Sequence, residues 1–102
     1  MRTAIVTGGT AGIGLAVAES LLLRGHGVFV CGRDERRLAG ALSRLKPHGG
    51  NRVGGAICDV RSLSSVEAMA AAAKDCFGRI DALINCAGIA FITPFEEIAP
   101  EQ

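Results

Sequence analysis

At 102 residues, 49% of them apolar, the chain is long enough to bury the core of one domain and too short for two. A formal net charge of +1 gives no reason to expect nucleic acid or an anionic membrane as partner, and no apolar run could span a bilayer. The four cysteines form no CxxC pair and stand at no metal-ligand spacing from a histidine, so we expect reduced thiols, no metal site and a cytoplasmic location.

Four short apolar runs predict strands that are buried on both faces, as the strands of a parallel sheet are. These runs cover residues 3–7, 28–31, 53–58 and 82–85. Gly54 and Gly55 weaken the prediction of the third strand, because a glycine contributes no side chain to strand packing. After Gly88 the pattern is lost in a loop, so we expect the fourth strand to form an unpaired, apolar edge of the sheet.

Three longer segments between these runs carry apolar residues three or four positions apart, which predicts helices. The expected helices cover residues 12–24, 34–47 and 62–78. Asp34 is well placed to cap the second helix, and Pro47 is expected to end it. Ser62 or Ser64 begins the third helix, and Pro100 is a candidate start for a fourth.

Strands and helices therefore alternate as βαβαβαβ with short links between them. Such alternation implies right-handed crossovers and a parallel sheet that is covered by helices. The predicted fold class is α/β, one half of a doubly wound nucleotide-binding sheet with the strand order 3-2-1-4. No repeat or linker composition divides residues 1–102, which we interpret as the N-terminal part of a single NAD(P)-binding domain.

The turn from the first expected strand to the first helix is rich in glycine, with the sequence TGGTAGIG over residues 7–14. Gly8 permits a sharp turn, Gly12 lets backbone approach a pyrophosphate, and Gly14 lets the helix pack close to the strand. The helix N-terminus directs unpaired N–H groups and the positive end of its dipole at the anion. No Lys-Ser/Thr pair follows the last glycine, which excludes a Walker loop.

The GxxxGxG spacing of this loop resembles the cofactor motif of short-chain dehydrogenases/reductases, which have a Rossmann-like fold. Three further segments resemble that family in the expected order along the chain. They are Gly32-Arg33, Cys58-Asp59-Val60 and Asn85-Cys86-Ala87-Gly88. The resemblance implies that Asp59, with Val60 beside it, accepts a hydrogen bond from the adenine amino group; alternatively, Asp59 only caps the next helix. Thr10 is expected to contact a phosphate and Ile13 to pack under the nicotinamide.

The last of these segments resembles an Asn-Asn-Ala-Gly motif that follows the fourth strand of the family. In that motif the residues steady the sheet and line the ribose and nicotinamide side of the cofactor. The resemblance therefore implies cofactor-binding roles for Asn85, Ala87 and Gly88. Cys86 departs from the motif, because its thiol cannot make the hydrogen bonds of an amide.

The end of the second strand distinguishes the two dinucleotides. An NAD enzyme of this kind places an acidic residue there to bind the ribose 2′-hydroxyl, whereas this chain has Gly32, which leaves room, and then Arg33. A guanidinium can fork onto a 2′-phosphate with charge-assisted hydrogen bonds, so NADP is the expected cofactor. The alternative is NAD, with Asp34 or Glu35 as the ribose ligand, although Asp34 has a sufficient role as a helix cap.

Two more arginines follow on the second expected helix. Arg36 and Arg37 could add to the positive field around a 2′-phosphate. A solvated helix face is the simpler interpretation of both, because charged residues normally occupy the outer face of such a helix.

Catalysis in this family uses a Tyr as general acid/base, a Lys that lowers its pKa, a Ser that polarises the carbonyl, and an Asn that completes a proton relay. The present sequence contains no tyrosine, and its only lysines, Lys46 and Lys74, fall on expected helices of the nucleotide-binding part. We therefore expect no catalytic residue in the chain, and no efficient carbonyl reduction by it alone.

Three hypotheses of function follow. The first is the NADP(H)-binding half of an oxidoreductase that interconverts a ketone and a secondary alcohol, with some resemblance to the ketoreductases of polyketide and fatty-acid synthesis over residues 28–38 and 58–62. The second is a non-catalytic module that senses NADP(H). The third is a fragment that acts by docking to a partner chain through its open sheet edge, where we also expect self-association.

Overall fold

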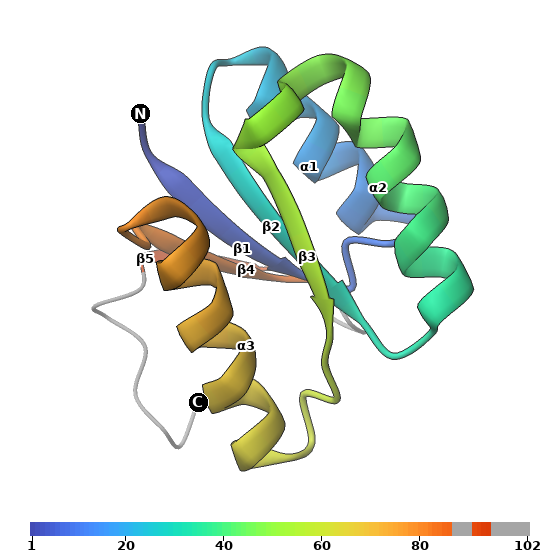
Figure 1. The fold of residues 1–102 in the computed structure, drawn as a ribbon, viewed down its shortest axis with the longest axis vertical. Coiled ribbons are helices and arrows are strands. Elements are labelled where there is room, and N and C mark those ends of the chain that lie inside the picture. Colours follow the sequence, from blue (N-terminus) through green and yellow to red (C-terminus); the bar gives the residue numbers. More distant parts are fainter. Residues whose placement is uncertain (87–90, 95–102) are drawn as a thin grey trace.

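A single sheet with the strand order β3-β2-β1-β4-β5 organises the molecule (Figure 1). The computed structural model describes residues 1–86 and 91–94. The strands are β1 (Thr3–Thr7), β2 (Gly27–Gly32), β3 (Val53–Ile57), β4 (Ala82–Asn85) and β5 (Phe91–Pro94). The first four pair in parallel, which confirms the predicted α/β class and the order 3-2-1-4.

Three helices connect the parallel strands, and their caps explain where they begin and end. The helices are α1 (Gly12–Leu23), α2 (Glu35–Gly49) and α3 (Leu63–Phe77). The Asp34 side chain accepts a hydrogen bond from the Arg37 N–H at 3.0 Å, and that of Ser62 accepts one from the Ser65 N–H at 3.3 Å. The prediction that Pro47 ends the second helix is wrong by two residues. Pro47 lies inside the last turn, two residues before the helix ends at Gly49.

The helices cover the two faces of the sheet unequally (Figure 1). On one face α1 and α2 pack side by side, and Val6, Val28 and Val30 lie in the core beneath them. On the other face α3 covers a smaller core, in which Ile5 and Phe29 are buried. Alternate residues of each strand thus enter different cores, and this explains the continuous apolar runs of the sequence.

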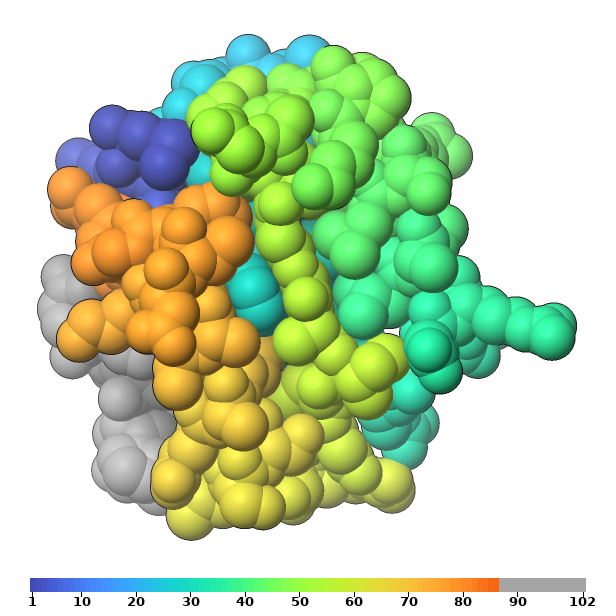
Figure 2. All heavy atoms as spheres, viewed as in Figure 1, coloured from blue at the N-terminus to red at the C-terminus, as the bar shows by residue number. Residues whose placement is uncertain are grey.

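The two glycines of β3 lie where neighbouring elements approach the strand most closely. A Cβ added to Gly55 would be 2.9 Å from the Val30 carbonyl oxygen and 3.0 Å from the side chain of Leu38 in α2. A Cβ on Gly54 would be 3.1 Å from Phe29 and from the Cys76 sulfur of α3. Because they lack a Cβ, these glycines allow β2, α2 and α3 to pack closely against β3. Figure 2 shows β3, in lime, at the surface between α2 and α3, where it forms one edge of the sheet.

The prediction of an unpaired fourth strand is wrong, because β5 pairs with β4 in antiparallel orientation. Asn85 lies opposite Phe91, and Ala82 lies opposite Pro94. The backbone groups that β4 was expected to leave open are therefore paired, and β5 is the strand at this edge of the sheet. The helix predicted from Pro100 lies outside the described residues. Within the described part of the chain, no helix is long and apolar enough to cross a membrane.

At the amino end of the parallel strands, one side chain gathers several backbone carbonyls. The Arg52 guanidinium donates to the carbonyl oxygens of Leu22 at 3.1 Å, His26 at 2.8 Å and His48 at 3.1 Å. Two of these carbonyls belong to the last turns of α1 and α2. The cation thus satisfies helix ends whose carbonyls carry partial negative charge.

The same substitution at two glycines should have opposite effects on stability. We expect Gly55→Ala to lower the free energy of unfolding by about 1–3 kcal/mol, because the new methyl group meets the Val30 backbone. Gly40→Ala should raise it by about 0.4–1 kcal/mol, because Gly40 lies on an exposed face of α2 with no atom near its Cβ position. Urea unfolding followed by circular dichroism measures both, and a destabilised Gly40→Ala together with a neutral Gly55→Ala would contradict this packing.

Candidate functional site

The carboxyl ends of the parallel strands meet at one edge of the sheet, and the loops that follow them enclose a hollow of about 290 Å³. We call it the carboxyl-edge hollow. It is lined by Gly8, Thr10, Ala11, Cys31, Gly32, Arg33, Arg37, Cys58 and Val60. A second, more polar hollow of about 500 Å³ adjoins it and shares Thr10, Arg33 and Arg37 with it. Five of the residues predicted to bind a cofactor therefore lie around one space.

The glycine loop supplies one wall of the hollow. Gly8 has a φ of 70°, which permits the sharp turn at the end of β1, and its N–H donates to the Cys31 carbonyl at 2.9 Å. Gly12 has a φ of 57° and no atom within 4 Å of its Cβ position, so its backbone faces open space. A Cβ on Gly14 would lie 2.1 Å from the Gly8 carbonyl oxygen, and the helix can pack this closely only with glycine there.

The N-terminus of α1 differs from those of the other two helices. Asp34 and Ser62 cap α2 and α3 with their side chains, but Ala11 at the start of α1 makes no side-chain cap. The first turn of α1 also contains no acidic residue. Its backbone N–H groups and the positive end of its dipole are therefore available to an anion beside the hollow.

Two arginines give the hollow its positive charge. Arg33 and Arg37 are exposed and line both adjoining hollows. The sequence predicted Arg33, whereas the simpler interpretation of Arg37 was a solvated helix face. The signal that could have identified Arg37 is the cap itself, because Asp34 accepts from the Arg37 N–H and so fixes this residue in the first turn of α2. That bond uses one acceptor position on Asp34 Oδ1.

The space above Gly32 is not open, which corrects an expectation from the sequence. A Cβ on Gly32 would lie 3.0 Å from Thr10 Cγ2 and 3.1 Å from Thr10 Oγ1. The Thr10 side chain therefore takes up the room that the glycine was expected to leave. An acidic residue at this position would have to displace Thr10 from the wall of the hollow.

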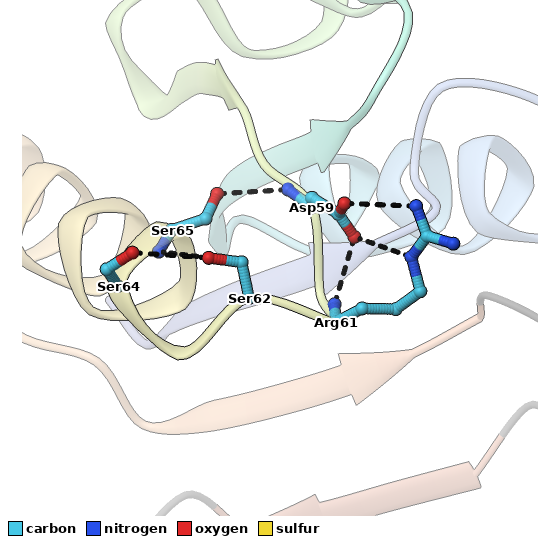
Figure 3. A network of polar contacts seen from close by, with 5 residues as sticks. All are labelled: Asp59, Arg61, Ser62, Ser64 and Ser65. Carbon is cyan, nitrogen blue, oxygen red and sulfur yellow. Dashed lines mark hydrogen bonds and ion pairs between the residues drawn. The ribbon is translucent and has the colours of Figure 1, made fainter.

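The loop after β3 presents a carboxylate that is held by an arginine (Figure 3). Arg61 Nε donates to Asp59 Oδ1 at 3.1 Å, and Nη2 donates to Oδ2 at 3.2 Å. These bonds, with help from the Arg61 backbone N–H and the charge of Arg33, hold the pKa of the Asp59 carboxyl below its ordinary value. Asp59 does not cap α3, since Ser62 does. Val60, beside it, is 43% exposed and lines the hollow.

The end of β4 is joined to the end of β1 through polar side chains. Thr7 Oγ1 donates to Asn85 Oδ1 at 2.9 Å, and the Cys86 N–H donates to the Thr7 carbonyl at 3.0 Å. Asn85 thus helps to fix the strand ends next to the glycine loop. Ile13, near the start of α1, is 69% exposed and so offers apolar surface to a ligand. The predicted residues Ala87 and Gly88 lie outside the described part of the chain.

Two buried thiols form the floor of the hollow. Cys31 and Cys58 are 0% and 2% exposed, and all four cysteines of the chain are unpaired. Burial raises the pKa of the Cys31 thiol to about 12, and the neighbouring Cys58 adds to this shift. Cys31 is therefore protonated at neutral pH and is no nucleophile. Among residues 1–86 and 91–94, no three His, Cys, Asp or Glu side chains come together as a metal site.

Comparisons with known proteins identify the family to which the chain is similar. A sequence model of the family described as "short chain dehydrogenase" matches residues 2–102. The "Granaticin polyketide synthase putative ketoacyl reductase 1" of Streptomyces violaceoruber is 43% identical over 98 residues, which are 96% of this chain and 36% of that protein. A solved structure of an actinorhodin polyketide ketoreductase variant with NADPH is 41% identical, with a TM-score of 0.81 over 98% of this chain and 38% of its own.

A second solved structure shows the same relationship. The NADPH-bound short-chain oxidoreductase of Pseudomonas aeruginosa PAO1, which contains an atypical catalytic center, is 39% identical with a TM-score of 0.81. The match covers 98% of the present chain and 39% of that structure. The chain therefore spans little more than a third of the length of these relatives. Because the family model matches nearly all of its residues, the chain belongs to the short-chain dehydrogenase family.

Proposed function

We propose that this chain is the NADP(H)-binding part of an oxidoreductase that, as a complete protein, interconverts a ketone and a secondary alcohol. The observation that carries the proposal is the carboxyl-edge hollow, where a glycine turn, an uncapped helix N-terminus and two arginines converge. Each of these features offers hydrogen-bond donors or positive charge to an anionic ligand. A phosphate-rich dinucleotide fits such a set of donors.

The residues around the hollow divide among the parts of the dinucleotide. Gly12 and the N-terminus of α1 would hold the pyrophosphate. Arg33 and Arg37, which line both hollows, would hold the 2′-phosphate. Asp59 would hold the adenine, as the family resemblance implies. On the nicotinamide side the family resemblance supplies the assignments, which are Ile13, Asn85, Ala87 and Gly88.

The charges at the end of β2 favour NADP over NAD. A ribose 2′-hydroxyl is normally bound by a carboxylate at the end of this strand, where the present chain has Gly32, and Asp34 serves as the cap of α2 through its Oδ1. Arg33 and Arg37 instead offer two guanidinium groups, which suit a phosphate. Two of the related structures contain NADPH by their own descriptions, and they support the same choice.

Bound NADP(H) would supply or accept the hydride in the reaction. The carbonyl oxygen of a substrate also needs a proton donor, and the chain contains no tyrosine to act in the manner of its family. We therefore propose that the chain positions the cofactor, while the groups that transfer the proton come from outside these 102 residues. The name of the granaticin relative suggests a ketoacyl group as the substrate class of the complete enzyme.

The arginines should set the preference for NADP. Charge-assisted hydrogen bonds contribute about 1.5–3 kcal/mol each, and at this exposed site we expect the low end, or roughly tenfold tighter binding of NADPH than of NADH. Arg33→Ala and Arg37→Ala should each reduce this ratio, and the double variant should remove nearly all of it while NADH binding changes little. Calorimetric titration of the wild type and the three variants with each cofactor measures these ratios.

Arg36→Ala provides the matched control for these variants. It removes the same charge from the same helix turn, but Arg36 does not line either hollow. The NADPH preference should therefore remain within about twofold of the wild type. Equal affinities of the wild type for NADPH and NADH, or a preference for NADPH that survives in the double variant, would contradict the assignment of NADP as the cofactor.

The chain on its own should bind the cofactor without turning over a substrate. With no tyrosine to donate a proton, we expect no oxidation of NADPH above background across a panel of ketones and ketoacyl thioesters. Absorbance at the NADPH band measures this. Turnover that disappears when Gly14 is changed to Ala would show that the chain carries its own proton donor.

A further inference from the structure

In the network of Figure 3, Asp59 and Arg61 are joined by more hydrogen bonds than a surface ion pair with a single contact. Three donors of one residue reach the Asp59 carboxylate, since the Arg61 backbone N–H donates to Oδ1 at 3.0 Å in addition to Nε and Nη2. Both residues lie on the short loop between β3 and α3. The guanidinium therefore fixes the plane of the carboxylate, which a single contact would leave free to rotate.

The backbone of this loop is fixed as well, from the side of α3. The Asp59 N–H donates to Ser65 Oγ at 3.0 Å, and the Ser62 N–H donates to the Asp59 carbonyl at 3.0 Å. Ser65 in turn donates its N–H to Ser62 Oγ. The main chain at Asp59 is thus bound to the first turn of α3, and the side chain is bound to Arg61.

The hydrogen bonds from Arg61 leave part of the acceptor capacity of the Asp59 carboxylate unused. An ionised carboxylate offers about two acceptor positions on each oxygen. Oδ1 receives two donors from Arg61, and Oδ2 receives one. One acceptor position therefore remains on Oδ2, on a side chain that is 37% exposed and adjoins Val60 at the hollow.

We propose, on the basis of the proposed function, that Arg61 is a positioning residue, which orients the Asp59 carboxylate so that Oδ2 selects the amino group of adenine. The phosphates and the ribose of a dinucleotide offer no comparable cationic or amino donor to an anionic acceptor. A base that carries a carbonyl in place of the amino group would place two acceptors against each other. Arg61 thereby contributes to selectivity for the base without touching the ligand itself.

The choice of pH separates two effects of Arg61, which are its effect on the orientation of the Asp59 carboxylate and its effect on the charge of that carboxylate. The charged groups that face Asp59 are Arg61 and Arg33, and both lower the pKa of its carboxyl. The ordinary pKa of an aspartate is about 3.9, so at neutral pH the carboxylate is ionised with or without Arg61. An effect of removing Arg61 at neutral pH therefore reports orientation. In acid, a variant without Arg61 protonates the Asp59 carboxylate at a higher pH than the wild type does, and so loses this hydrogen-bond acceptor first.

The test compares NADPH with its hypoxanthine analogue, in which a carbonyl replaces the adenine amino group. One hydrogen bond to a charged group gives about tenfold discrimination in the wild type at pH 7, and Asp59→Ala sets the baseline near one. Arg61→Ala and Arg61→Lys should both fall to roughly threefold or less, since a lysine keeps the charge but cannot fork onto both oxygens. Calorimetry measures each ratio.

Arg79 provides a matched control within the same chain. Its guanidinium forks onto Asp81 with the same spacing of two residues, and Nε donates to Oδ2 at 2.9 Å. This pair lies just before β4, at the opposite end of the sheet from the hollow. Arg79→Ala removes an equivalent pair and should leave base discrimination within about twofold of the wild type.

The outcomes distinguish this inference from the proposed function. Retention of the NADPH-over-NADH ratio in Arg61→Ala shows that the hollow is intact and that only base selection has changed. Full discrimination in Arg61→Ala or Arg61→Lys overturns the positioning role while the cofactor assignment stands. A wild type that does not discriminate between NADPH and its hypoxanthine analogue likewise overturns the positioning role while the cofactor assignment stands. A wild-type chain that binds neither dinucleotide overturns both proposals.

Discussion

The arrangement of the site depends on the contact between Gly14 and the backbone of Gly8. No side chain fits at Gly14, because a Cβ would lie 2.1 Å from the Gly8 carbonyl oxygen. The contact places the start of α1 directly behind the end of β1, so that the first N–H groups of the helix point into the space between the strand ends. Arg33 and Arg37 reach the same space from the end of β2 and from α2, and Val60 reaches it from the loop after β3, next to Asp59. Their positions are useful only because the glycine contact has fixed α1.

The sequence allowed the sheet and its caps to be predicted closely, because both depend on local chemistry. The four parallel strands, the cap by Asp34 and the end of the third helix at Gly78 follow from short-range patterns. The strand β5 was missed because a run of only four residues gives no periodic signal. Pro47 was misplaced because the rule for proline does not distinguish the interior of a helix from its last turn.

The candidate site was predictable as a set of loops but not as a set of contacts. The glycine motif, Arg33 and Asp59 could be identified along the chain, and the structure brings them to one edge of the sheet. Contacts between loops could not be identified, because they depend on how far each loop bends. Thr10 fills the space above Gly32, and Arg61 reaches back to Asp59; neither follows from periodicity or spacing.

The two ends of the sheet differ in what satisfies their backbone. At the amino end, Arg52 binds three carbonyls and the Thr3 N–H donates to Asp81 at 2.8 Å, so the protein supplies its own partners. At the carboxyl end, the donors at the start of α1 have no capping side chain. In the language of amide exchange, we expect the backbone at the amino end to exchange more slowly than the uncapped amides at the start of α1.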